Sequence, residues 1–380
     1  MADALFDLPP EYVALRAAAR ELAAEVAPLA HRAEKVDGFV PEVRSLLQRS
    51  GLTGVVVPAA YGGRFESVDS LAVTVVREAL AAGAGHLDSM FAMQGIGSFA
   101  LARAGSADLQ GRWLPAVGRL EAVPALALTE PEIGSDLKSL ATKVESDGDE
   151  VVVTGTKSFI TNAGEADFYC VLGREGTGYS LVLVEADRSG VSVSHPHEVM
   201  DHHVLGDVVF DGVQVPAGNR IGEAGEGFAH VLATLATFRV SVAGASLGVA
   251  EAALREAIAH AQGREMFGTT LSRIGGVPES LALCWTEIEM ARSLAYRAAA
   301  AAARDPQANL HLSSMAKVGA TEVAGRVVDR AVQVMGRFGL VRGSTVERLY
   351  REARPMRIYE GSTEVILDSL ARQLMKRRPE

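Results

Sequence analysis

Two apolar runs, Tyr169-Cys170-Val171-Leu172 and Ser180-Leu181-Val182-Leu183-Val184, are separated by the turn signal Glu175-Gly176-Thr177-Gly178. Aromatic and β-branched residues favour strands, and glycines between two such runs favour a hairpin. Further runs are Val151-Val152-Val153, Val208-Val209-Phe210 and Val213-Gln214-Val215, with turn signals at Asp147-Gly148-Asp149 and Asp211-Gly212. The sequence therefore predicts a small antiparallel β domain over residues 121–222.

Sequence with helical periodicity lies on both sides of this domain. Residues 1–120 are rich in alanine and leucine at helical spacing, which predicts an all-helical domain. Later segments near 227–263, 277–304, 309–338 and 362–376 have lengths that suit an antiparallel four-helix bundle. The predicted fold class is α+β and multidomain: an N-terminal all-α domain over 1–120, a central β-barrel or β-sandwich domain over 121–222, and a C-terminal four-helix bundle over 223–380.

Charge and cysteine content narrow the class of protein. The formal net charge of −10 and the isoelectric point near 5.5 argue against a nucleic-acid-binding or anionic membrane surface. Only Cys170 and Cys284 occur, which fits a reducing cytoplasm and offers no disulfide framework. We expect both to be buried thiols in a cytoplasmic protein.

The N-terminal segment Met1–Pro10 lacks the basic and apolar regions of a signal peptide. Apolar stretches such as 71–84, which Arg77 and Glu78 interrupt, are shorter than the roughly 20 residues that span a membrane. We therefore expect a soluble protein.

Near the C-terminus, Arg357-Ile358-Tyr359-Glu360-Gly361-Ser362-Thr363-Glu364 lies between two helical patterns and places the carboxylate of Glu360 beside a glycine. An apolar pocket raises the pKa of a carboxyl group toward the working pH, which makes its carboxylate an effective base. A glycine beside it lets a ligand approach the main chain. By itself a Tyr-Glu-Gly tripeptide is more often a helix end than a site. The assignment of Glu360 as a catalytic base therefore depends on the rest of the chain.

Several other segments occur in the order known from one family. They are Ala127-Leu128-Thr129-Glu130-Pro131-Glu132-Ile133-Gly134-Ser135-Asp136, Gly155-Thr156-Lys157-Ser158-Phe159-Ile160-Thr161-Asn162-Ala163, Arg264-Glu265-Met266-Phe267-Gly268, Gln333-Val334-Met335-Gly336 and Val346-Glu347-Arg348-Leu349-Tyr350-Arg351-Glu352-Ala353-Arg354. With Tyr359-Glu360-Gly361, they make the chain resemble the acyl-CoA dehydrogenase family of flavoproteins. The matches reach residue 375 and cover essentially the whole chain, and the family has the same helical, β and helical order.

The resemblance implies an FAD cofactor and residues that bind it. The implied flavin-binding positions are Leu128, Thr129, Gly134, Ser135, Phe159, Ile160, Thr161, Ser362 and Glu364. In the family the aromatic ring at Phe159 packs on the flavin, and the hydroxyl at Thr161 reaches the N5 atom that receives hydride. Arg264, Phe267, Gln333 and Gly336 match positions that contact FAD, and Arg264, Gln333 and Gly336 match ones that reach the FAD of a neighbouring subunit, which implies a homo-oligomer, dimer or tetramer.

The resemblance also implies substrate contacts at Ser135, Arg239 and Gly361. Some members supply their base from the position of Phe238, and because phenylalanine cannot act as a base, Glu360 is the matching base in this chain. The implied reaction is α,β-dehydrogenation of an acyl thioester, carried by CoA or by a carrier protein. Glu360 removes the α proton, the β hydrogen leaves as hydride to FAD, and an electron-transferring flavoprotein accepts the electrons.

Four positions depart from the family pattern. Ile133 replaces a small residue, Gly275 a glutamine, Arg337 the second glycine of a pair, and Glu364 a residue that is more often glutamine. The departures at Ile133, Gly275 and Arg337 keep open a flavin-dependent oxidase or monooxygenase on the same fold. A non-catalytic flavin-binding relative is a third alternative, against which Glu360 and the acidic charge argue.

Each segment also has a purely structural interpretation. Residues 129–136 fit a strand followed by a proline-containing turn, Phe159 fits a strand core, and Arg264 fits a cation at a helix end. The histidines of His195-Pro196-His197-Glu198 and Asp201-His202-His203 match no common zinc spacing and favour a surface turn over a metal site. No Gly-x-Gly-x-x-Gly segment follows a strand, which weakens the case for a nicotinamide cofactor.

Overall fold

The computed structural model describes residues 8–36, 38–201 and 203–376, so most of the N-terminal segment Met1–Pro10 and His202 lie outside the described residues. The chain forms two compact units. Of the described residues, the helical unit comprises 8–31, 70–88 and 238–376, and the sheet unit comprises 32–36, 38–69, 89–201 and 203–237. Each unit is therefore assembled from segments that are far apart in the sequence.

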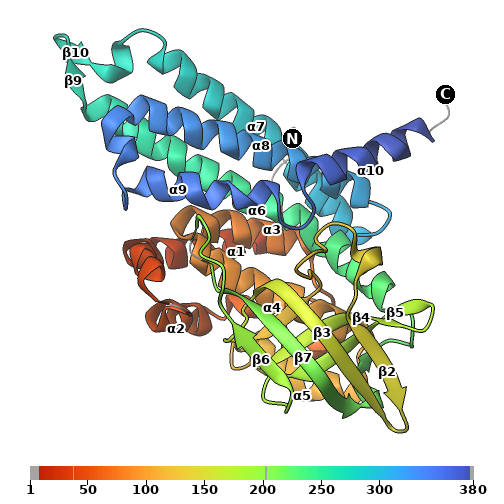
Figure 1. Ribbon diagram of the computed structural model, residues 1–380. Coiled ribbons are helices and arrows are strands. Elements are labelled where there is room, and N and C mark those ends of the chain that lie inside the picture. The colour runs from red at the N-terminus through yellow and green to blue at the C-terminus, as the bar shows by residue number, and fades with distance from the viewer. Residues whose placement is uncertain (1–7, 37, 202, 377–380) are drawn as a thin grey trace. The chain divides into compact units, whose positions relative to one another are not determined.

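The sheet unit contains one eight-stranded sheet in the order β6-β7-β3-β2-β4-β5-β8, with β1 paired to β4 (Figure 1). Its strands are β1 (Pro124–Ala127), β2 (Lys143–Asp147), β3 (Glu150–Thr161), β4 (Phe168–Glu175), β5 (Gly178–Glu185), β6 (Val191–Ser194), β7 (Leu205–Pro216) and β8 (Arg220–Ile221). The pairs are antiparallel except for β1 and β2 against β4. The predicted hairpin is confirmed, because β4 and β5 pair in register from Phe168 opposite Glu185 to Glu175 opposite Gly178.

The prediction of a turn at Asp211-Gly212 is wrong. Both predicted runs on either side belong to the single strand β7, in which Val213 pairs with Val153 and Phe210 with Gly155. Two residues thus face one, which is a β-bulge, and Gly212 takes a φ of +61° there. A glycine-containing bulge and a hairpin turn share the same sequence signal.

Helices accompany the sheet in its unit. They are α2 (Pro41–Ser50), most of α4 (Gly85–Ala104), α5 (Ala107–Gly118), the first residues of α6 (Gly227–Gly263), and 3-10 turns at Leu52–Val56, Ala59–Tyr61, Leu137–Ser139 and Ala217–Asn219. A further 3-10 helix, Ala27–Lys35, crosses from the helical unit. Cys170 on β4 is fully buried and donates to the main-chain oxygen of Gly97 on α4. Cys284 is also buried, so the prediction of two buried thiols is confirmed.

The helical unit contains α1 (Pro10–Val26), α3 (Ser70–Gly83), most of α6, α7 (Val277–Arg304), α8 (Leu310–Met335), α9 (Thr345–Ala353) and α10 (Thr363–Met375). Its shorter elements are β9 (Glu265–Met266), β10 (Thr269–Thr270) and 3-10 turns at Leu271–Arg273, Gly336–Leu340 and Pro355–Arg357. The predicted helices 227–263 and 277–304 are confirmed in full. Helix α8 ends before Gly336, whose φ of +56° an L-residue adopts only with strain.

The core of the helical unit is built from α3, α6, α7, α8 and α9. Glycines let helices α3 and α6 approach closely. A Cβ at Gly244 would lie 2.4 Å from the main-chain oxygen of Thr74, and a Cβ at Gly248 would lie 2.0 Å from that of Glu78. Helix α10 buries only Ile366 and extends away from the other helices of its unit (Figure 1). The helix that completes this core is thus α3, which comes from the N-terminal part of the chain.

Helix α6 is longer than the apolar stretch 71–84. Its 37 residues include a window with a mean hydropathy of 1.4, enough by composition alone to cross a membrane. However, 83% of that window is buried within the protein, as in the core helix of a globular domain. The helix also carries Arg239, which binds the main chain of Glu360.

Candidate functional site

Glu360 lies on a short turn between the 3-10 helix Pro355–Arg357 and α10, with a φ of +52°. This left-handed conformation costs a residue with a Cβ about 1–2 kcal/mol. Two cations hold the turn: Arg239 on α6 donates from Nε to the main-chain oxygen of Glu360 at 3.0 Å, and Lys317 on α8 donates from Nζ to that of Gly361 at 2.6 Å. The main chain that carries the carboxylate is therefore fixed from two helices.

The surroundings of the Glu360 carboxyl group favour its action as a base. Its Oε2 atom is buried and has no hydrogen-bond partner among the described residues. Burial raises the pKa of the Glu360 carboxyl above its usual value, although the charges of Arg77, Arg239 and Lys317 act in the opposite direction. A carboxylate in such surroundings has a strong tendency to take up a proton.

The site also shifts the pKa values of Lys317 and Arg239, the two cations that hold the turn. Burial lowers the pKa of the Lys317 ammonium to about 8, while the charge of Glu360 opposes that shift. Burial also lowers the pKa of Arg239, which donates a second hydrogen bond from Nη1 to Ser314 Oγ at 3.2 Å. Lys317 is fully buried, and the sequence analysis did not single it out.

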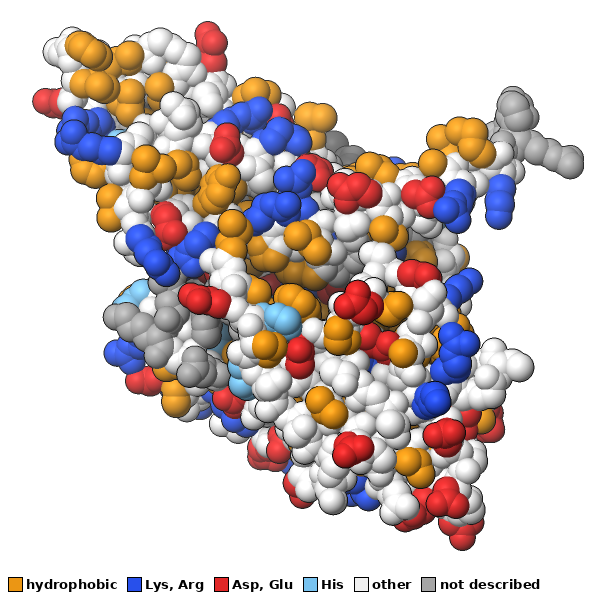
Figure 2. Space-filling model, viewed as in Figure 1, with side chains coloured by type: hydrophobic (Ala, Val, Ile, Leu, Met, Phe, Trp, Pro, Cys, Tyr) orange, Lys and Arg blue, Asp and Glu red, His pale blue; other side chains and the backbone are white. Residues whose placement is uncertain are grey.

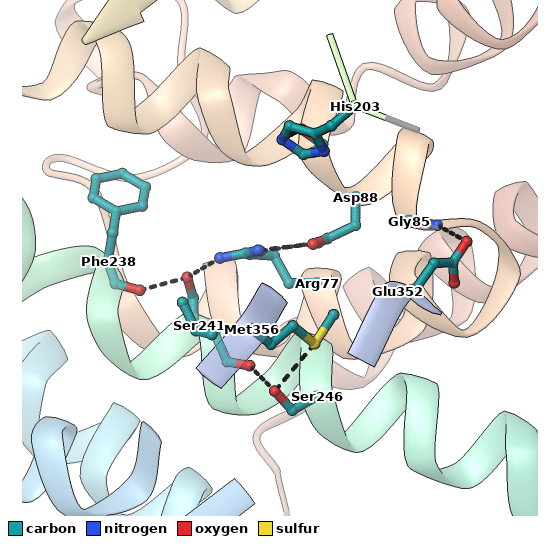
Figure 3. A network of polar contacts seen from close by, with 11 residues as sticks. Arg77, Gly85, Asp88, His203, Phe238, Ser241, Ser246, Glu352 and Met356 are labelled. Atoms are coloured by element: carbon teal, nitrogen blue, oxygen red, sulfur yellow. Dashed lines mark hydrogen bonds and ion pairs between the residues drawn. The ribbon is translucent and has the colours of Figure 1, made fainter. Parts of the chain in front are cut away.

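A second polar group of the helical unit was also missed. Arg77 on α3 pairs with Asp88 at the start of α4 through two hydrogen bonds, Nε to Oδ1 at 2.9 Å and Nη2 to Oδ2 at 2.7 Å, and its Nη1 donates to Ser241 Oγ at 2.9 Å (Figure 3). The signal that could have found this group is the interruption of an apolar helical stretch by Arg77 and Glu78. Charges inside such a stretch need buried partners.

In the sheet unit, a buried ion pair anchors the segment that holds Leu128 and Thr129. Lys157 Nζ on β3 donates to Glu130 Oε1 and to the main-chain oxygen of Leu128, both at 2.9 Å. The main-chain N–H of Ser158 donates to the oxygen of Thr129 at 2.9 Å. Burial alone would raise the pKa of Glu130, but hydrogen bonds from Ala141, Thr142 and Lys157 lower it. Gly134 and Ser135 lie beyond this anchor and are exposed, so they can meet a ligand.

Phe159 presents an aromatic ring at the end of β3. The residue has a φ of +55° and is 50% exposed, and its ring stacks on His197 with centroids 3.9 Å apart. His197 Nε2 lies 2.9 Å from Asp207 Oδ1, which also accepts from Ser158 Oγ at 2.6 Å. Burial alone would raise the pKa of Asp207, but these contacts lower it. The interpretation of Phe159 as a core residue is therefore wrong.

The neighbours of Phe159 differ from it. The side chain of Ile160 lies in the hydrophobic core of the sheet unit, so only its main chain can meet a ligand. Thr161 is half-buried.

The residues assigned to the outer part of FAD are grouped at one end of the helical unit. The guanidinium groups of Arg264 and Arg337 lie 5.7 and 5.0 Å from the ring centre of Phe338. Phe267 is 89% exposed with a φ of +52°, and Gln333 and Gly336 are also exposed. Of the departures from the family pattern, Arg337 joins this cluster, Gly275 is exposed with a φ of +50°, and Ile133 pairs with Glu130 in a tight turn.

Backbone strain coincides with these assignments. Among the described residues, five with a side chain have positive φ, and three of them are Phe159, Phe267 and Glu360. Strained conformations persist where the surroundings fix them and concentrate at functional sites. The structure brings Glu360, Gly361 and Arg239 together, and in the other unit Leu128, Thr129 and Phe159. Ser362 caps α10 by accepting from the N–H of Val365, and Glu364 is exposed.

The histidine-rich segment has protein partners. His195 Nδ1 lies 2.7 Å from the main-chain oxygen of Leu205, and His203 Nε2 lies 3.2 Å from Ser89 Oγ. Within residues 8–36, 38–201 and 203–376, no three His, Cys, Asp or Glu side chains gather as a metal site.

Comparison with known proteins gives matches along the whole chain. Family models described as the N-terminal, middle and C-terminal domains of acyl-CoA dehydrogenase match residues 9–121, 125–213 and 225–375. The chain is 34% identical over 368 residues to cyclohexane-1-carbonyl-CoA dehydrogenase of Geobacter metallireducens, covering 95% of this chain and 96% of the relative.

Two solved structures are similar along most of their length. A glutaryl-coenzyme A dehydrogenase in complex with glutaryl-CoA is 28% identical with a TM-score of 0.91, covering 98% of this chain and 97% of that one. An acyl-CoA dehydrogenase of Bacillus anthracis complexed with FAD is 26% identical with a TM-score of 0.89, covering 97% of this chain and 68% of that one.

Proposed function

The chain belongs to the acyl-CoA dehydrogenase family, and we propose that Glu360 is the base that removes the α proton of its acyl thioester. The protein is an FAD-dependent oxidoreductase that acts on the CH–CH group of an acyl-CoA. The observation that carries the assignment is the buried, unpartnered Oε2 of Glu360 on a turn that Arg239 and Lys317 hold.

The surroundings of Glu360 suit the removal of a weakly acidic proton. In the resting site the charges of Arg77, Arg239 and Lys317 favour the carboxylate, while burial favours the neutral acid. The proton moves from the α carbon to Glu360, so the base ends in the form that burial favours. A fixed main chain keeps the carboxylate in the geometry that proton transfer requires.

The residues present fit FAD. A half-exposed aromatic ring held in a strained conformation at Phe159 provides a flat apolar surface, and the nearby main chain of Leu128 and Thr129 is anchored by Lys157 and Ser158. When bound, FAD supplies the acceptor for the β hydrogen as hydride. In this proposal Phe159 orients the isoalloxazine ring, Thr161, Ser362 and Glu364 contact it, and Ser135, Arg239 and Gly361 contact the acyl thioester.

The proposed assembly is a homo-oligomer, dimer or tetramer, in which Arg264, Phe267, Gln333 and Gly336 contact the FAD of a neighbouring copy. The exposed apolar residues of the helical unit support it, because an interface between copies would remove such side chains from water. Figure 2 shows such side chains near β9 and β10 and on α10. Phe267 lies between β9 and β10, and Leu367, Leu374 and Met375 lie on α10. Sedimentation at several protein concentrations tests the assembly, and a monomer would contradict it.

We also propose that the protein works in the cytoplasm and passes its electrons to an electron-transferring flavoprotein. Reduced protein mixed with a purified electron-transferring flavoprotein should regain its oxidised flavin spectrum without oxygen. Rapid oxygen consumption on adding substrate would instead favour the oxidase or monooxygenase alternative.

The proposed function is tested by following the flavin absorbance without oxygen while acyl-CoAs, and then carrier-protein thioesters, are added. We expect at least one acyl-CoA to bleach the flavin band, and Glu360→Gln to bind the same thioester without bleaching. A Glu360→Gln protein that bleaches at the wild-type rate would contradict the assignment of Glu360.

A further inference from the structure

We propose that the buried ion pair Arg77–Asp88 is a positioning element for Glu360, in which Arg77 supplies a nearby positive charge and Asp88 keeps that charge from binding the base directly. The inference rests on the proposed role of Glu360. It adds two residues to the machinery of proton removal that no sequence motif of the chain identifies.

The pair is rigid and enclosed. Arg77 is 3% exposed and Asp88 is 4% exposed, and two parallel hydrogen bonds join the guanidinium to the carboxylate. The third contact runs from Arg77 Nη1 to Ser241 Oγ, which donates to the main-chain oxygen of Phe238 at 2.6 Å (Figure 3). Phe238 directly precedes Arg239, which holds the main chain of Glu360. One turn of α6 therefore carries both Ser241, which accepts from Arg77, and Arg239, which binds the main chain of Glu360.

Arg77 acts on Glu360 through its charge, since the described residues provide no hydrogen bond to Oε2. Burial disfavours the Glu360 carboxylate, and the charges of Arg77, of Arg239 on α6 and of Lys317 on α8 favour it. Asp88 on α4 acts against it. Reciprocally, burial lowers the pKa of Arg77, while the charges of Asp88 and Glu360 raise it. Burial lowers the pKa of Lys317, and Glu360, Glu322 and Glu364 raise it.

A contribution to the stability of the fold does not by itself explain why a buried ion pair is present here. Removing two charges from water costs several kcal/mol each, and apolar residues of similar volume often serve as well. Apart from Ser70, Thr74 and Glu78, the rest of α3 is apolar. Glu78 pairs with Arg292 and Tyr296. Asp88 accepts from Nε and Nη2 of the guanidinium and Ser241 accepts from Nη1, so all three nitrogens already have partners other than the Glu360 carboxylate. The pair thus permits a positive charge near the base without a salt bridge to it.

Removing Arg77 and removing Asp88 should shift the pH profile of proton removal in opposite directions. A purely structural role of the pair predicts no such opposition. Removing the positive charge in Arg77→Met should disfavour the Glu360 carboxylate. The acid limb of the pH profile of α-proton exchange should then move up by about one pH unit. Removing the negative charge in Asp88→Asn should move that limb down by a similar amount and lower the plateau, because Arg77 is then free to bind Glu360. The double variant should fall between the wild type and Arg77→Met.

The measurement is the exchange of α protons for deuterium, followed by mass spectrometry in D2O across pH with an arylacetyl-CoA bound. Its β carbon carries no hydrogen, so the readout reports proton removal without hydride transfer. Arg77→Lys, which keeps the charge, should retain the wild-type profile. Arg292→Met is the matched control, because Arg292 forms ion pairs with Glu78, Glu251 and Glu289 in the same unit and is not among the strongest influences on Glu360.

Shifts in the same direction for Arg77→Met and Asp88→Asn, or no shift in either, would overturn the inference. If Arg77→Met does not fold, a profile of Asp88→Asn that stays in place or moves to higher pH is sufficient to overturn it. Failure of the base assignment gives a different result: Glu360→Gln would then still exchange the α proton at the wild-type rate.

Discussion

Arg239 donates a hydrogen bond from Nε to the main-chain oxygen of Glu360 at 3.0 Å, across 121 positions of sequence. The arginine binds the backbone of the proposed base and leaves Oε2 without a partner among the described residues. It therefore fixes the position of the carboxylate without forming the salt bridge that would neutralise it.

Arg239→Met should slow flavin reduction by about 10- to 100-fold, because the turn that carries Glu360 loses one of its two anchors. Arg239→Lys should recover only part of the rate, since an ammonium group cannot donate to Glu360 and Ser314 with the same geometry. Stopped-flow absorbance at saturating acyl-CoA measures the rate. An unchanged rate in both variants would show that the anchor is unnecessary.

Glu360→Gln should lose flavin reduction by at least about 10³-fold and yet unfold at a temperature equal to or above that of the wild type. Folding raises the pKa of the Glu360 carboxyl above its unfolded value, so the ionised carboxylate opposes folding. This penalty is absent below the unfolded pKa and grows as pH rises through the folded pKa. Thermal unfolding at pH 5 and pH 8 checks the sign, because the gain in Tm should be larger at pH 8.

The pH dependence of flavin reduction should show two limbs. The rate should rise as Glu360 loses its proton, with an apparent pKa above that of an ordinary glutamate, and fall as Lys317 loses its charge near its pKa of about 8. Lys317→Arg should move the alkaline limb to higher pH, because a guanidinium stays charged. A limb that stays in place would assign it to another group.

Gly361→Ala should destabilise the protein by about 1–3 kcal/mol and slow flavin reduction. The residue has a φ of +101°, and its Cβ would lie 3.2 Å from Ile366 Cγ1 and 3.3 Å from Arg239 Nη2. Gly343→Ala is the control, since Gly343 has a φ of +86° with open space around it. Denaturant titration should show a smaller loss for Gly343→Ala, which should also leave the rate intact.

Lys157→Met should cost about 3–5 kcal/mol, because it leaves the Glu130 carboxylate buried without its charged partner. The double variant Lys157→Met/Glu130→Gln should recover much of this loss. Since folding lowers the pKa of Glu130, the stability it contributes is present above the unfolded pKa and is lost as pH falls through the folded pKa. FAD retention on gel filtration should fall in Lys157→Met and recover in part in the double variant, because Lys157 also holds the main chain of Leu128.

Local sequence patterns predicted much of the fold. The hairpin of β4 and β5, the helices 227–263 and 277–304, and the family itself followed from short-range signals. Hydrophobic periodicity and turn residues act over a few positions, so the sequence alone reveals them. The same short range explains the error at Asp211-Gly212, where a bulge and a turn require the same glycine.

Sequence by itself determined the fold class, the family and the candidate base Glu360. Tertiary structure alone decided what surrounds that base: Lys317 and Arg239 as clamps, Arg77 with Asp88 as a nearby pair, and α3 as a core helix of the helical unit. Their contacts join positions as far apart as 77 and 241 or 239 and 360. A charge inside an apolar stretch signals only that a partner must exist, and packing between distant segments determines which residue that partner is.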